Sequence, residues 1–217
     1  MRLYLSSFRL GQEPQHLTRM AGSSRRALVV VNSCDLFAEP ERAPRVRQEI
    51  EALRGLGFEP EELDLRRYFR EPNAAALAQQ LSGAGLVWVR GGNPFVLIRA
   101  MRRTGFSALL REQIVQNALV YGGYSAGVAM LTPSLHGIEL VDDPKSVPEG
   151  YDSEVIWDCL GLLDYFVAPH YRSDHPESAA IDKVVEYFID HHMFFRALRD
   201  GEAIVVEGKH EQLVGRR

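Results

Sequence analysis

The chain has 217 residues, with 25 Lys and Arg against 29 Asp and Glu, which gives a formal net charge of −4. This balance, without a basic stripe along the sequence, argues against a nucleic-acid partner. A chain of this length most simply forms one domain, residues 1–217, and buries a core that needs no disulfide staples.

Cysteine content and hydropathy indicate the compartment. The two cysteines, Cys34 and Cys159, are too few for a disulfide framework, which favours a reducing environment. The sequence shows no signal-peptide pattern, and no apolar run approaches the length of a membrane span. We therefore expect a cytoplasmic protein with no membrane partner.

Apolar runs and helical periodicity predict elements that alternate along the chain. Predicted strands cover residues 3–5, 27–31, 59–65, 86–89, 118–120, 165–168 and 203–206, with a further strand after Gly208. Predicted helices cover residues 12–20, 44–56, 72–81, 95–103, 108–116 and 176–195. Strands that alternate with helices predict an α/β fold, with a mostly parallel sheet covered by helices on both faces.

Polar residues follow four of the predicted strands. They are the segments 32–35 and 91–93, and the single residues Ser125 and His170. Binding and catalytic sites of open α/β sheets form at the carboxyl ends of the strands. The sequence therefore predicts an active site at this edge of the sheet.

The segment around Ser125 is the strongest motif. Residues 123–127 read GYSAG, the G-x-S-x-G pattern of a strand-to-helix turn that exposes a nucleophilic serine. The glycines allow the tight backbone, and the Ala126 amide at the start of the next helix is placed to donate to an oxyanion. Gly92, in the glycine pair 91–92, is the predicted second oxyanion donor, because glycine allows the backbone to approach a ligand.

A serine hydroxyl needs a base, and the base needs an acid to orient it. His170 is the best of the seven histidines, because it directly follows a predicted core strand. The long polar loop 132–158 offers three carboxylates for the acid. Glu139 is the first choice, and Asp142 and Asp143 remain open.

Other site chemistries find less support. His170, Asp174 and His175 are close in sequence, but they match no zinc signature. The glycine pair 91–92 lacks the remaining glycines of a dinucleotide fingerprint. We therefore predict neither a metal nor a cofactor.

Three segments together resemble the peptidase E family of serine dipeptidases, which also includes cyanophycinases. The chain reads GGNPF at 91–95, GYSAGV at 123–128 and APHY at 168–171, in the family's order. The resemblance implies a fold like that of class I glutamine amidotransferases, with flavodoxin-like layering and a serine in place of their cysteine. It also implies a Ser-His-Asp/Glu triad, with Ser125 as nucleophile, His170 as base, Gly92 as an oxyanion donor and the acid in the loop after the serine.

The chain departs from this family pattern at two places. Val128 replaces the usual alanine after S-A-G, a modest packing change. Aspartate-specific members carry an arginine after the base that pairs with the substrate's side-chain carboxylate, and here that place falls near Ala179. Alanine cannot supply a bidentate contact to a carboxylate, and Arg172 is close in sequence but not at the matching position. Strict aspartyl specificity is therefore not expected.

The sequence thus predicts a serine hydrolase that cleaves a small peptide or related amide through an acyl-enzyme. An esterase that uses the same triad, or a binding protein that has kept only the fold, are the alternatives. Asn93, Tyr124 and Arg172 are the predicted substrate contacts, and orientation of its loop is the alternative role for Asn93. We expect a monomer or a homodimer.

Overall fold

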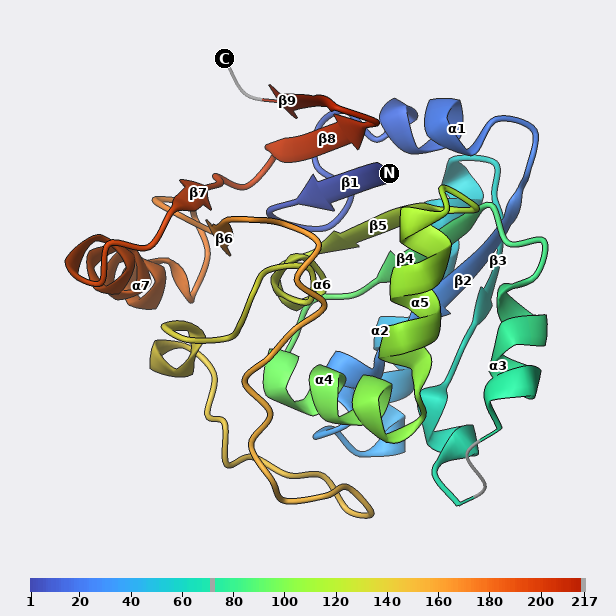
Figure 1. Ribbon diagram of the computed structural model, residues 1–217, viewed down its shortest axis with the longest axis horizontal. Helices are drawn as coiled ribbons and strands as arrows, with labels where there is room; N and C mark the ends of the chain where they lie inside the picture. The colour runs from blue at the N-terminus through green and yellow to red at the C-terminus, as the bar shows by residue number, and fades with distance from the viewer. Residues whose placement is uncertain (71–72, 216–217) are drawn as a thin grey trace.

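A seven-stranded sheet forms the centre of the molecule (Figure 1), in a computed structural model that describes residues 1–70 and 73–215. The order across the sheet is β3-β2-β4-β5-β1-β8-β9. The strands are β1 (Arg2–Ser6), β2 (Arg26–Val30), β3 (Glu59–Glu62), β4 (Leu86–Val89), β5 (Val120–Tyr124), β8 (Ala203–Glu207) and β9 (His210–Val214). The first five in this order run parallel, and β8 and β9 form an antiparallel hairpin beside β1.

The alternation of side chains along each strand divides the interior into two cores, one on each face of the sheet. In β1, Leu3 and Leu5 belong to one core, and Tyr4 between them belongs to the other. All three are fully buried. Strands buried on both faces are expected to read as continuous apolar runs, as β2 and β4 do.

Helices cover both faces of the sheet. One face carries α1 (Gln15–Ala21) and α2 (Glu39–Gly55), whose buried residues Leu17 and Leu53 belong to the core of Tyr4. The other face carries α3 (Ala74–Leu81), α4 (Pro94–Arg103), α5 (Phe106–Val115) and the short α6 (Ala126–Ala129). The predicted mostly parallel sheet with helices on both faces is confirmed. No helix among the described residues is long and apolar enough to cross a membrane.

A second, two-stranded sheet lies beside the main one. It pairs β6 (Phe166–Ala168) with β7 (Phe195–Ala197) in parallel, and α7 (Ser178–Asp190) connects the two strands. The prediction that His170 follows a strand of the main sheet is therefore wrong, because β6 belongs to this smaller sheet. The predicted helix 176–195 ends five residues early, since Phe195 pairs with Phe166 instead of extending the helix.

The remaining elements differ from the prediction mainly at their ends. Helix α2 begins at Glu39 and includes Pro44 in its interior, whereas the sequence predicted a start at residue 44. Strand β5 continues through both glycines to Tyr124, whereas the apolar pattern predicted an end at residue 120. The predicted start of the third helix, residue 72, lies outside the described residues.

Candidate active site

Ser125 lies at the sharp turn between β5 and α6. Its backbone has φ 51° and ψ −115°, a conformation that a residue with a side chain rarely adopts. The turn packs against the end of β4 so closely that a Cβ on Gly127 would lie 2.3 Å from the Val89 carbonyl oxygen. The side chain of Ser125 makes no capping hydrogen bond to α6. The hydroxyl of Ser125 is therefore not used to cap the helix.

The glycine pair 91–92 lies directly against this turn. A Cβ on Gly91 would lie 3.0 Å from the Cβ of Ser125 and 2.8 Å from the ring of Tyr124, so only glycine fits there. Ser33 fixes the loop, because its hydroxyl donates to the Gly91 carbonyl at 2.8 Å. Gly92 has φ 136°, which favours glycine.

Asp200 is the carboxylate that contacts His170. His170 Nδ1 lies 2.8 Å from Asp200 Oδ1, and a carboxylate can only accept, so Nδ1 carries the proton and Nε2 is left with a free lone pair. The His170 amide donates to Ser7 Oγ at 2.8 Å, and Ser7 Oγ donates to Asp200 at 2.8 Å. Burial raises the pKa of Asp200, but the hydrogen bonds from His170 and Ser7 outweigh it, so that the pKa lies below its usual value. Hydrogen bonds thus hold the imidazole of His170 against the Asp200 carboxylate.

The prediction that the acid comes from the long loop is not what the structure shows. Glu139 lies in a 3₁₀ turn, Ile138–Leu140, and its buried Oε2 has no hydrogen-bond partner in the described part of the chain. Asp143 is exposed and accepts from the amide of Lys145 within its own loop. Asp142 lines a small cavity beside Ser125. None of the three holds His170; Asp200 does.

A cavity of about 350 Å³ joins these groups. Ser125, His170, Gly91 and Gly92 all line it, which places the serine, the imidazole and the glycine loop around one space. The volume suits a small ligand.

The three residues predicted to contact substrate lie in different places relative to this cavity. Tyr124 lines the cavity, and its hydroxyl donates to the buried carboxylate of Glu49 at 2.8 Å. Asn93 is buried and caps α4, its Oδ1 accepting from the amides of Phe95 and Val96, so it orients the loop. Arg172 is exposed, lies over the ring of Tyr171, and does not line the cavity.

His175 and Glu177 complete the wall around His170. The rings of His170 and His175 stack at 3.7 Å with an interplanar angle of 7°, and Glu177 Oε2 lies 4.0 Å from His170 Nε2. Ligand atoms of these three residues lie within 4.8 Å of one another. A metal binds an imidazole nitrogen in the plane of its ring, and two parallel stacked rings do not direct their lone pairs at one point. The arrangement therefore fits packing of the His170 ring against His175 better than it fits a metal site.

Comparison with known proteins now identifies the family. The family model described as peptidase family S51 matches residues 16–214. The chain belongs to peptidase family S51. Members of this family are serine peptidases, and the chain is accordingly a serine peptidase.

The relatives of this S51 peptidase carry related names. An uncharacterized peptidase of Listeria monocytogenes is 29% identical over 158 residues, covering 73% of this chain and 72% of its own. A probable alpha-aspartyl dipeptidase of Drosophila melanogaster is 30% identical, covering 64% and 57%. A peptidase E of Streptomyces coelicolor is 32% identical, covering 64% and 55%. The solved structure of a putative peptidase E from Listeria monocytogenes superposes with a TM-score of 0.80 over 100% of this chain and 98% of its own, and at 23% identity it shows the shared fold.

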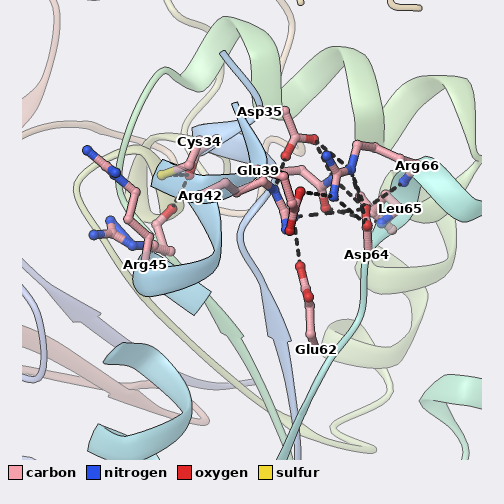
Figure 2. Close-up of polar contacts among 12 residues, drawn as sticks. Cys34, Asp35, Glu39, Arg42, Arg45, Glu62, Asp64, Leu65 and Arg66 are labelled. Carbon is pink, nitrogen blue, oxygen red and sulfur yellow. Dashed lines mark hydrogen bonds and ion pairs between the residues drawn. The ribbon is translucent and has the colours of Figure 1, made fainter. Parts of the chain in front are cut away.

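Asp35, the last residue of the first polar segment that the sequence placed at this edge, belongs to a network of ion pairs in this S51 peptidase (Figure 2). Asp35 pairs with the buried guanidinium of Arg42, which also reaches Glu62 at 2.7 Å. Arg66 forms a second ion pair, with Asp64 at 2.8 Å. The hydroxyl of Tyr151, in the long loop, donates to Asp35. This network ties α2, the end of β3 and the long loop together beside the glycine pair.

Proposed function

We propose that this S51 peptidase cleaves short peptides or related amides with Ser125 as nucleophile, His170 as general base and Asp200 as the acid that orients His170. The observation that carries this proposal is that His170 is held at two points, its ring and its backbone amide. Asp200 and Ser7 fix its ring and its backbone, and its free Nε2 belongs to a residue that lines the same cavity as Ser125.

The reaction follows from these positions. His170 Nε2 takes the proton of Ser125 Oγ as the oxygen attacks the scissile carbonyl. Amide groups of Gly92 and Ala126 donate to the oxyanion, and Asp200 stabilises the imidazolium. The proton passes to the leaving amine, and water then hydrolyses the acyl-enzyme with His170 again as base. Because α6 is only four residues long, its dipole is small, and stabilisation of the oxyanion rests on the two amides themselves.

The test uses single substitutions and a probe for the serine. Ser125→Ala and His170→Ala each lower kcat on the best substrate of a dipeptide panel by about 10⁴-fold or more, because members of a triad act as a unit. Labelling by a fluorophosphonate is lost in Ser125→Ala. His191→Ala, at the exposed end of α7, is the matched control and keeps wild-type rates.

Near-normal turnover in either active-site variant would contradict the roles of Ser125 and His170. A wild-type protein that hydrolyses simple esters but no peptide would instead be an esterase. A protein that neither turns over substrates nor reacts with the fluorophosphonate would be a binding member of the fold.

A further inference from the structure

The peptide group between Gly91 and Gly92 has its two polar ends in different surroundings. Its carbonyl oxygen, on Gly91, accepts from side chains of Ser33, Cys34 and Arg90. Its N–H, on Gly92, donates no hydrogen bond to any atom of residues 1–70 and 73–215. Gly92 also lines the 350 Å³ cavity of the active site. The fold thus holds one end of this peptide and leaves the other end without an acceptor in the described part of the chain.

Ser33 makes the shortest of these contacts. Its Oγ lies 2.8 Å from the Gly91 oxygen and 3.1 Å from the Arg90 carbonyl oxygen, and its single proton is best placed for the nearer one. Only 2% of Ser33 is exposed, so water does not compete for this bond. The Ser33 carbonyl accepts from the Asn93 amide at 3.0 Å and would lie 2.8 Å from a Cβ on Gly92. Ser33 is therefore packed directly against the glycine pair.

Arg90 brings a charge to the same carbonyl. Its Nη1 lies 3.3 Å from the Gly91 oxygen. Helix α2 holds the guanidinium in place, because the Oε1 of buried Glu49 lies 3.2 Å from Arg90 Nε. The same oxygen accepts from the Tyr124 hydroxyl at 2.8 Å. Glu49 therefore ties the residue before the glycine pair and the residue before Ser125 to one helix.

Peptide geometry converts these contacts into an orientation of the N–H. A trans peptide is planar, so its C=O and its N–H point in opposite directions. Donors that hold the Gly91 carbonyl on one side therefore fix the direction of the Gly92 N–H on the other. Hydrogen bonds to the carbonyl also polarise the peptide, which makes its N–H a stronger donor. Without them, two glycines in succession would allow this peptide to rotate, because neither has a Cβ to oppose it.

We propose that Ser33 and Arg90 are positioning residues of the reaction, which orient and polarise the Gly92 N–H toward the oxyanion that forms when Ser125 attacks. This inference rests on the proposed function, because it takes Ser125 as the nucleophile. Both side chains act through the peptide between residues 91 and 92. Because the oxyanion develops only as the transition state is approached, removal of either side chain slows the chemistry and leaves substrate binding in place.

The first measurement separates kcat from KM on the best substrate of a dipeptide panel. Ser33→Ala is expected to lower kcat by about 10- to 100-fold, less than the complete loss of an oxyanion donor, because a misdirected N–H keeps part of its effect. Arg90→Gln gives a smaller decrease, since its contact to the carbonyl is longer. KM stays close to the wild-type value in both variants. A side chain that only binds substrate would instead raise KM and leave kcat unchanged.

The rate of fluorophosphonate labelling is a second measurement that needs no peptide. Phosphonylation of Ser125 also develops negative charge on an oxygen that the two amides would stabilise. The labelling rate constant is therefore expected to fall in Ser33→Ala and Arg90→Gln, in the same order as kcat. The final extent of labelling counts the competent sites and stays at the wild-type level. A residue that only stabilises the fold would lower the extent of labelling and leave the rate of the remaining sites unchanged.

Two variants elsewhere in the fold are matched controls. Thr104→Val removes a buried hydroxyl that donates to the Ala100 carbonyl at 2.8 Å. Arg26→Gln removes a half-buried guanidinium that pairs with Glu61 at 2.7 Å and donates to two backbone carbonyls. Neither residue lines the active-site cavity. Both variants therefore lose contacts like those of Ser33 and Arg90 but keep the wild-type kcat and labelling rate.

Ser33→Ala with the wild-type kcat and labelling rate, or with only a raised KM or only a lower extent of labelling, would overturn the inference. If Ser33→Ala yields no folded protein, Arg90→Gln decides by the same two measurements. Failure of the proposed function looks different, because turnover then survives Ser125→Ala or the wild type is not labelled. If Ser125→Ala abolishes turnover and labelling while the other two variants change neither, the nucleophile stands and only the positioning roles are wrong.

Discussion

At the scale of single residues, Asp200 is the side chain whose role is most directly testable. In Asp200→Asn the amide can donate to His170 Nδ1 and favours the tautomer that protonates Nε2, which then cannot take the serine proton. We expect kcat to fall by about 10²- to 10⁴-fold with little change in KM. Steady-state kinetics check this, and Asp174→Asn, an exposed aspartate in the loop after His170, serves as the control. A variant with wild-type kcat would remove Asp200 from the mechanism.

The sequence identified the serine and the histidine of this cavity but not the aspartate. Ser125 and His170 lie in local motifs, whereas Asp200 lies thirty residues beyond His170 in a short turn without a signature. One signal was available: a polar turn directly before the strand that begins at Ala203. Because β8 is antiparallel to β1, with Ala203 opposite Ser6, the amino end of β8 lies at the same edge as the carboxyl ends of the parallel strands. Asp200 also follows β7 (Phe195–Ala197), but the sequence predicted a helix through residue 195 in place of that strand, so a search for polar residues after predicted strands missed it.

At the scale of elements, the close packing of the serine turn on β4 predicts a difference between two glycines. Gly127→Ala places a Cβ 2.3 Å from a backbone oxygen of β4, so the turn must move, and we expect a loss of about 2 kcal/mol or more in the free energy of unfolding. Gly55→Ala, at the end of α2, meets no atom within 4 Å and is expected to gain about 0.5–1 kcal/mol. Urea unfolding measures both, and equal stabilities would contradict this packing of the turn on β4.

The elements that the sequence predicted best are those with the strongest local pattern. The run 86–89 coincides with β4, and helix α4 begins one residue before its predicted start because Asn93 caps it. The pairing of β6 with β7 could not be predicted in the same way, because it depends on residues 29 positions apart that share no pattern. The end of α7 is set by that pairing, together with the left-handed backbone of His192, φ 54°.

At the scale of the whole molecule, alternation of strands and helices was enough to predict the layers, because buried parallel strands need helices on both faces. The direction of the last two strands was not predictable from the apolar runs 203–206 and beyond 208, since parallel and antiparallel strands share the same period. That direction decides the site, because it brings Asp200 to Ser7 and His170. The arrangement of the proposed catalytic residues is therefore a property of topology as much as of motif.

The carboxyl group of Asp142 makes the stability of the folded protein depend on pH. Its pKa is about 7 in the folded protein and near 3.8 in an unfolded chain, so between these values the folded state binds more protons than the unfolded state. Stability from this group is therefore complete below about pH 4 and declines as the pH rises to 7. The pKa values of Asp64 and Asp200 are lowered in the folded protein, so these groups act in the opposite direction. Their contribution to the stability of the fold is lost only as the pH falls below about 4.

Asp142→Asn removes the pH-dependent contribution of Asp142 to stability and leaves those of Asp64 and Asp200. We expect the variant to be more stable than the wild type by about 2 kcal/mol at pH 8, with a difference that shrinks toward pH 4. Chemical denaturation across this pH range measures the difference, and Asp143→Asn, which is exposed, should show none. A variant that is less stable at pH 8 would show that Asp142 instead has a structural partner.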